Sequence, residues 1–411
     1  MKRRDFLDVL LAMAAANTAR SQTAGPVAPE PAKKLKVDAY SRHLQWLRAP
    51  DEVAEAVIEM GYDGIDLTVR PYPGHVDPEK VETDLPPFVK TLRKQGLRVD
   101  AITCPITDAD SPNAEKILQT ASSLGITHYW WGTFRYQPDK PVLEQLDALK
   151  PRVAKLAALN AKYKMTAMYH TYSGAATVGA AIWDFLYVLR NFDPAQVGFQ
   201  YDLGHMTNAG GNGTWALSLR AADRYIAGVS VKDSVMEQNL DVRGGGPMTP
   251  EVAAAMAAGF GRGRGGPGGP GPGGDFGPDG SPAGGGARGR RGPGGAGPGA
   301  GQAGGAAAGG RGGRGGGPGG GGGRGGAATA TIPPWRVRQV PLGEGMDNLP
   351  LFASILKEIN FSGPMEIQAE YPNGGANNAA DKITLPRAQV LGAMKRDLLA
   401  LKAAFGPSGL L

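Results

Sequence analysis

Residues 197–206 read VGFQYDLGHM, a short run that ends at Asp202 and has His205 three residues further on. Its length and its content of Val, Phe and Tyr predict a buried β-strand. The same arrangement, a short apolar run with polar residues directly after it, recurs along the chain. We predict eight strands, over residues 35–40, 64–69, 97–103, 127–131, 165–170, 197–202, 226–232 and 364–370.

Helical patterns separate these strands. Val53, Val57 and Met60 share one helical face that ends at Gly61, and a later helix ends near Gly125. A strand and helix unit that recurs roughly every 30 residues, eight times, predicts a (β/α)8 TIM barrel rather than an open sheet. In such barrels the functional residues lie at the carboxyl ends of the strands.

Glycine and positive charge are concentrated outside this pattern. Residues 261–330 hold 37 of the 64 glycines, eight arginines and two acids, which alone accounts for the formal net charge of +6. Residues 1–36 carry a further +4, so the remaining 305 residues, 37–260 and 331–411, carry about −4. The predicted barrel is therefore mildly acidic, which argues against a nucleic-acid binder.

The glycine-rich tract cannot bury a core, because glycine loses the most backbone entropy on folding and offers no side chain to pack. We predict a long disordered Gly/Arg-rich insertion after strand seven, on the functional face of the barrel. Its Arg-Gly runs resemble RNA-binding segments, but only Phe260 and Phe276 could stack on bases. The single cysteine excludes an intrachain disulfide framework.

The N-terminus reads MKRRDFLDVLLAMAAANTARSQTA, which resembles a twin-arginine export signal, with Arg3-Arg4 before a short apolar run. The run is too short to be a stable membrane anchor, so we expect recognition by the twin-arginine machinery and an exported, periplasmic protein. An amphipathic helix with a chance arginine pair is the alternative. The predicted organisation is an export signal over 1–24, a Pro/Ala spacer over 25–34, strands one to seven over 35–243, the insertion over 244–330 and completion of the barrel over 331–411.

The predicted strand ends bring together side chains suited to proton transfer and to binding a polar ligand. Four of the five histidines of the chain fall just after strands. In chain order the candidates are His43, Arg70, His75, Trp130, His170, Asp202, His205, Lys232 and Glu370. Trp130 suits stacking on the apolar face of a ligand, whereas Trp131 has the opposite parity and is at least as suited to the core. Arg70 suits an anionic or polyhydroxyl ligand or a surface ion pair.

The chain resembles the xylose isomerase-like TIM-barrel superfamily, the sugar phosphate isomerase and epimerase group. The resemblance rests on QYDLGHM, on the VKD of strand seven and on VPLGEGMDNLPLFASILKEINFSGPMEIQAEYP over residues 340–372. It implies one divalent ion, manganese, zinc or magnesium, held by Glu, Asp, His and Glu at the ends of strands five to eight. It also implies a substrate-binding histidine three residues after the aspartate, where His205 stands.

Carried over residue by residue, the resemblance implies Asp202 and Glu370 as metal ligands, with His170 where strand five would supply a glutamate. At strand seven the family's histidine falls on Ser230, a poor ligand. Lys232 lies two residues further on the same strand face, so its ammonium would point at the same cavity. A cation there would compete with a metal ion or occupy its place. Glu366, in register with Glu370, is expected to face the barrel interior and pair there.

These residues suit one reaction class in particular. Moving a proton next to a sugar carbonyl needs a base at the C–H and a positive group for the enediolate oxygen. Glu370 or neutral His170 would be the base, and a divalent ion held by Asp202, His170 and Glu370 would be the positive group. Lys232 is a further catalytic candidate. We predict an exported sugar isomerase or epimerase. A lyase or hydratase acting on keto-sugars or keto-glycosides, and a carbohydrate-binding barrel with a degenerate site, remain open; a repair nuclease fits least.

Overall fold

The computed structural model describes residues 34–137, 139–174, 176–238, 335–371 and 380–411. The predicted export signal and almost all of the spacer lie outside these residues, and so does the predicted insertion. Within the described chain, strands and helices alternate in the order expected from the sequence.

Eight parallel strands close into a barrel in the order β1-β10-β7-β6-β5-β4-β3-β2. The predicted (β/α)8 fold is therefore confirmed. The strands are β1 (Val37–Tyr40), β2 (Gly64–Thr68), β3 (Arg98–Thr103), β4 (His128–Trp131), β5 (Thr166–His170), β6 (Val197–Asp202), β7 (Ile226–Val231) and β10 (Met365–Ile367). All eight coincide with predicted strands to within a few residues at each end.

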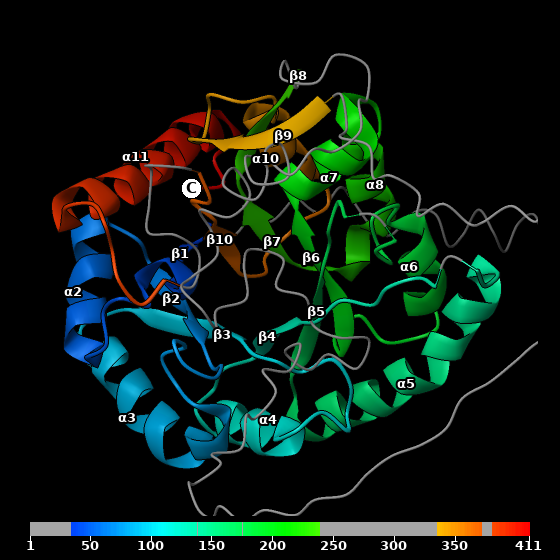
Figure 1. Ribbon diagram of the computed structural model, residues 1–411, viewed down its shortest axis with the longest axis horizontal. Coiled ribbons are helices and arrows are strands. Elements are labelled where there is room, and N and C mark those ends of the chain that lie inside the picture. The colour runs from blue at the N-terminus through cyan, green and yellow to red at the C-terminus, as the bar shows by residue number, and fades with distance from the viewer. Residues whose placement is uncertain (1–33, 138, 175, 239–334, 372–379) are drawn as a thin grey trace, which may run out of the picture.

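Helices surround the barrel, as Figure 1 shows in a view along its axis. The α-helices are α2 (Pro50–Met60), α3 (Val81–Lys94), α4 (Ala114–Ser123), α5 (Val142–Tyr163), α6 (Trp183–Leu189), α7 (Leu203–Gly210), α8 (Trp215–Ala222), α10 (Leu349–Glu358) and α11 (Arg387–Phe405). Short 3-10 turns are η1 (Ser41–Leu44), η2 (Pro78–Lys80), η3 (Gly211–Gly213), η4 (Asp223–Tyr225) and η6 (Gly406–Ser408). None of the described helices is long and apolar enough to cross a membrane.

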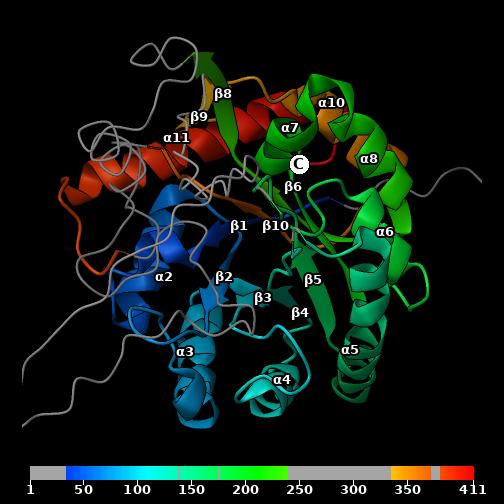
Figure 2. The same cartoon turned by 45° about the vertical axis from the view of Figure 1, so that its right-hand side comes forward.

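One two-stranded antiparallel sheet stands apart from the barrel. It pairs β8 (Asp233–Gln238) with β9 (Trp335–Val340), and its outermost pair joins Gln238 to Trp335. This sheet lies beside α7, as Figures 1 and 2 both show. The sequence analysis did not predict these two strands. They bring together the two ends of the segment 239–334, which lies outside the described residues.

The strand alternation separates two kinds of side chain. Large aromatic residues point outward and pack against the helices; Tyr201, for example, is fully buried against Trp215 and Phe352. The neighbouring residues Gln200 and Asp202 point into the barrel instead, where they meet polar partners from other strands. The barrel interior is thus polar, and burial of these groups demands that they be paired.

Candidate functional site

The site is built where β6 passes into α7. Asp202 is the last residue of the strand and caps the helix, because its Oδ1 accepts a hydrogen bond of 2.8 Å from the backbone N–H of His205. Its own N–H donates to the Thr171 hydroxyl at 2.9 Å, which fixes it against β5. The spacing of Asp202 and His205 thus places an imidazole on the first helical turn, over the carboxyl end of the barrel.

Lys232, directly after β7, lies at the centre of a group of polar side chains that also contains Asp202, His205, Gln368 and Glu370. Its Nζ lies 3.0 Å from each of four acceptors. The lysine is 2 % exposed. The acceptors come from strand ends and from α7: Asp202 Oδ2, Glu370 Oε2, Gln368 Oε1 and His205 Nε2. The three N–H groups of the ammonium donate to Glu370, Gln368 and His205, and Asp202 forms an ion pair with it. An ammonium carries only donors, so each of these atoms must present a lone pair to it.

This contact fixes the tautomer of His205. Because Nε2 accepts from Lys232, Nδ1 carries the proton and donates to the Ser173 hydroxyl, 3.0 Å away. Burial, together with the neighbouring Lys232 charge, lowers the pKa of His205 to about 3. His205 is therefore neutral near pH 7, and its ring position is fixed from both sides.

His170, at the end of β5, completes the group on the other side of Asp202. Its Nε2 lies 3.3 Å from Asp202 Oδ2, and its ring is 5.7 Å from that of His205. Burial lowers the pKa of His170, and the attraction of Asp202 only partly offsets this. His170 is thus a neutral, buried imidazole with its Nε2–H directed at a carboxylate.

The charges of the group stabilise one another. Burial would raise the pKa of Asp202 and of Glu370, but the Lys232 ammonium and the neighbouring histidines together outweigh it, so both pKa values lie below the ordinary ones. Burial would lower the pKa of Lys232, yet the two carboxylates raise it above its ordinary value. At neutral pH the group therefore holds one ammonium and two carboxylates. Breaking such a buried pair costs about 3–5 kcal/mol.

His170, Asp202 and His205 could hold a metal ion by donor type. One ligand atom from each lies within 4.8 Å of the others, and two imidazoles with a carboxylate suit zinc or manganese. The Lys232 ammonium lies 3.0 Å from two of these residues, in an ion pair with Asp202 Oδ2 and a hydrogen bond to His205 Nε2. A divalent ion about 4 Å from the ammonium would be repelled by about 8 kcal/mol at an effective dielectric constant of about 20. The donors suit an ion, but a charged Lys232 and a divalent ion do not fit this site together.

A second layer of polar residues supports the group from inside the barrel. Glu366 Oε1 accepts from Gln200 at 2.9 Å, from the Ser230 hydroxyl at 3.0 Å and from the Gln368 amide at 2.7 Å. The expectation that Glu366 faces inward and pairs there is confirmed. Burial, reinforced by Asp66, raises the pKa of Glu366 well above its ordinary value. Ser230 donates to Glu366 and belongs to this inner layer.

Three residues near the centre were missing from the sequence-based candidates. Gln368 contacts Lys232, Ser173 contacts His205, and the Tyr172 ring lies 4.6 Å from that of His170 and 4.8 Å from that of His205. Glu366, Gln368 and Glu370 are two positions apart along one extended segment, so the strand alternation already placed Gln368 on the same face as the two glutamates. Nothing in the sequence distinguished Tyr172 and Ser173 from other residues of their loop.

Trp130 and Trp131 point to opposite sides of β4, as strand alternation predicts. The Trp130 ring lies 6.0 Å from that of His170, and the Arg70 guanidinium carbon is 4.8 Å from a Trp130 ring. Trp131 instead packs outside the barrel against Phe134 and Tyr169, so it belongs to the core. Trp130 and Arg70 therefore lie on the His170 side of the group.

The two remaining histidines differ in position. His43, in η1, is buried and its charge contributes to lowering the pKa of Glu370, so it belongs to the surroundings of that carboxylate. His75 is not brought into the group. Its Nε2 bonds the Leu44 carbonyl at 3.2 Å and its Nδ1 the Thr68 hydroxyl at 2.8 Å. Both ring nitrogens thus hold the loop after β2 in place, so the structure gives His75 a structural role.

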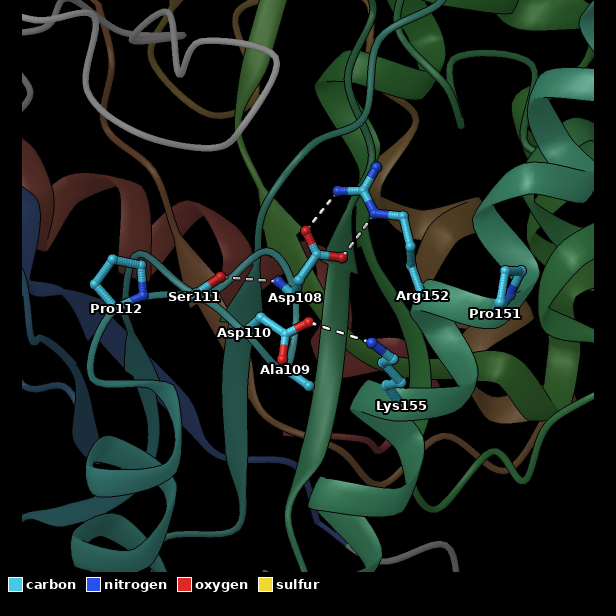
Figure 3. A pocket seen from close by; sticks show the side chains of 8 residues that line it. All are labelled: Asp108, Ala109, Asp110, Ser111, Pro112, Pro151, Arg152 and Lys155. Carbon is cyan, nitrogen blue, oxygen red and sulfur yellow. Dashed lines mark hydrogen bonds and ion pairs between the residues drawn. The ribbon is translucent and has the colours of Figure 1, made fainter.

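A pocket of about 410 Å³ lies elsewhere, between the loop after β3 and α5. Figure 3 shows Asp108 facing Arg152, and Asp110 facing Lys155, across it. These pairs neutralise one another, and no strand-end candidate lines the pocket. We therefore place the functional site at Lys232 and not in this pocket.

Comparisons with known proteins agree with the barrel fold. A family model described as xylose isomerase-like TIM barrel matches residues 54–262, about half of the chain. No curated protein matches the chain by sequence.

Two solved structures resemble the fold at low identity. One, described as the IolI protein with a binding zinc atom, is 12% identical with a TM-score of 0.53, and the match covers 90% of this chain and 99% of that one. The other is D-psicose 3-epimerase from Clostridium cellulolyticum H10 with D-tagatose, 10% identical with a TM-score of 0.51 and coverages of 90% and 99%. At these identities the likeness concerns the fold.

Proposed function

The chain belongs to the xylose isomerase-like TIM-barrel family, and from this premise we propose that it is a sugar isomerase or epimerase that moves a proton at a carbon next to a carbonyl. One observation carries the proposal. Glu370, an ionised carboxylate at neutral pH, lies 3.0 Å from the Lys232 ammonium at the mouth of a polar barrel. A base beside a cation is what enolisation of a sugar requires.

The residues divide the work as follows. The Glu370 carboxylate takes the proton from the carbon next to the carbonyl and becomes a carboxylic acid. The electron pair moves onto the carbonyl oxygen, giving an enediolate whose charge a cationic group stabilises. If the enediolate turns in the site before Glu370 returns the proton, the proton reaches the other face of the same carbon and gives an epimer. If Glu370 returns the proton to the neighbouring carbon, while the hydroxyl proton of that carbon passes to the enediolate oxygen, the product is an isomer. Atoms and charge balance in either case.

Other residues bind and orient the sugar in this proposal. His205, whose two ring nitrogens are held by Ser173 and Lys232, forms part of the substrate-binding surface, and Trp130 offers a flat apolar surface to the sugar ring. Arg70 and His43 add polar groups around Glu370 and Trp130. Neutral His170 is a second base, and its contact with Asp202 holds its ring in place.

A divalent ion of manganese, zinc or magnesium remains a prediction from the sequence, with Asp202, His170 and Glu370 as its ligands. Bound there, it would polarise a carbonyl oxygen. The ion would have to share two of these ligands, Asp202 and Glu370, with Lys232, and none of the proton steps above requires it.

Product analysis with a panel of keto-sugars and keto-glycosides tests the proposal. We expect the purified protein to convert at least one of them into an epimer or isomer of unchanged mass. A product lighter by one water would instead support a lyase or hydratase. Binding of a sugar without conversion of any panel member would support a carbohydrate-binding barrel.

The pH dependence of kcat is expected to be flat from about pH 5 to pH 8. Burial raises the pKa of Glu370, but Lys232, His43 and His205 lower it further, to below its ordinary value of 4.5. The base is therefore ionised throughout this range, and activity is lost only as the pH falls through the lowered pKa. An acidic limb with its midpoint near pH 6.5 would contradict Glu370 as the base.

We further propose that the protein is exported through the twin-arginine pathway. Replacing Arg3 and Arg4 together with lysine keeps the charge but removes the planar guanidinium groups. We expect the periplasmic fraction of the variant to fall at least tenfold in a bacterial host with this pathway, measured by immunoblot after fractionation. Arg20→Lys is the matched control. Equal fractions for the double variant and the wild type would contradict the proposal.

A further inference from the structure

We propose that the Lys232 ammonium is the resident cation of this site, in the place a divalent ion would take, so that the protein acts on its sugar without a bound metal. The catalytic half of this inference rests on the proposed function. The structural half, that Lys232 excludes a metal ion, stands on the contacts of Lys232 alone.

The first argument is the set of acceptors around the ammonium. Asp202, Glu370 and Gln368 each direct an oxygen at Nζ from 3.0 Å, and His205 directs a nitrogen from the same distance. These are the atom types that would ligate a divalent ion, gathered from β6, α7 and the end of the eighth barrel strand. Each lone pair that Lys232 engages is withdrawn from a metal ion.

The second argument is that the neighbours are oriented for a donor at the centre. The Gln368 NH₂ group donates to Glu366 Oε1 at 2.7 Å, so its carbonyl oxygen is the atom that faces Lys232. Glu366 is itself held by Ser230 and Gln200. The amide therefore cannot turn without losing a bond to a buried carboxyl group, and the inner layer fixes an acceptor for the ammonium.

The third argument is the space reserved for the lysine stem. A Cβ at Gly204 would lie 2.8 Å from Lys232 Cγ and 3.1 Å from its carbonyl oxygen. The first turn of α7 can pass this close only because residue 204 has no side chain. The backbone at Gly204 thus leaves room for the lysine side chain, and the ammonium of Lys232 reaches the centre of the four acceptors.

An ammonium in this place suits the charge movement of the reaction. Before proton transfer Lys232 faces the Glu370 carboxylate. When Glu370 takes the C–H proton it becomes neutral, and the negative charge appears on the sugar oxygen. The same ammonium serves as counter-ion in both states, so the site needs no second cation and no redox or hydrolytic partner.

Cobalt binding to untagged full-length protein tests the inference without relying on activity. In wild type we expect no Co²⁺ d–d absorption band between about 500 and 650 nm, and less than a tenth of an equivalent of Mn, Zn or Mg after purification. In Lys232→Met the lone pairs of Asp202 and His205 that face the ammonium are released beside His170, so we expect a stoichiometric Co²⁺ band and a Tm that rises on adding Zn²⁺. Lys155→Met, which removes an exposed lysine of α5, should behave as wild type.

Should Lys232→Met fail to fold, Lys232→Ala in the presence of Zn²⁺ provides a second variant with the same readout. Wild type that binds Co²⁺ as tightly as the Lys232 variants would overturn the inference, and so would activity that chelator abolishes and metal restores. In the second outcome the proposed isomerase function would survive. Absence of sugar conversion, with metal binding gained only on removing Lys232, would instead refute the function and retain the metal exclusion.

Discussion

Replacing Glu370 with glutamine is expected to lower kcat by about 10³-fold and to change KM by less than about threefold. The amide keeps the shape of the side chain and an oxygen for Lys232, but it cannot take a proton from carbon. A positioned general base contributes about 10²–10⁴-fold to such reactions. Steady-state kinetics on the sugar that the wild type converts would measure the effect.

The matched control is Glu344→Gln, which removes an exposed carboxylate of the loop before α10. Its kcat should stay within twofold of wild type. If Glu370→Gln retained more than a tenth of the wild-type kcat, the base would be another residue, and neutral His170 would become the candidate.

Replacing Asp202 with asparagine is expected to destabilise the fold by about 3 kcal/mol and to lower kcat by at least about 10²-fold. Asparagine caps a helix about as well as aspartate, so the hydrogen bond to the His205 N–H is kept. The substitution removes the negative charge 3.0 Å from the buried Lys232 ammonium. Of the two carboxylates that pair with Lys232, only Glu370 then remains. Urea unfolding followed by circular dichroism measures the change.

Asp77→Asn provides the control for Asp202→Asn. Asp77 also caps a helical turn, by accepting from the Glu79 N–H at 3.0 Å, but it lies outside the group at Lys232. Its free energy of unfolding should change by less than about 0.5 kcal/mol. Equal effects of the two substitutions would mean that the ion pair of Asp202 contributes little to stability.

The barrel was predictable from the sequence because its signals are local. Each strand is a short apolar run and each helix an amphipathic one, and their alternation leaves few topologies. β8 and β9 were not predicted because their pairing depends on Gln238 and Trp335, which are 97 positions apart. Their charged side chains, such as the exposed Arg336 and the half-buried Glu237, give no hydrophobic pattern to identify these strands.

Within the site, the sequence located residues on the rim but could not give their hydrogen bonds. It placed Lys232 on the same face as Ser230, and the structure adds the four acceptors at its Nζ. His75 follows a strand as His170 and His205 do, yet its ring turns to Leu44 and Thr68. The direction of a ring after a strand depends on loop geometry, which strand alternation does not determine. Tyr172 was not predicted as a site residue for the same reason, because it also lies in a loop after a strand.

The central claim is that this site exchanges a carbon-bound proton next to a sugar carbonyl. The most direct measurement is deuterium incorporation from D₂O into keto-sugars, followed by NMR, with metal-free wild type, Glu370→Gln and Glu344→Gln compared at equal concentration. The account predicts deuterium at one carbon adjacent to the carbonyl for wild type and Glu344→Gln, at a rate about 10³-fold lower for Glu370→Gln. Absence of exchange into every sugar of the panel, or equal exchange in all three proteins, would contradict it.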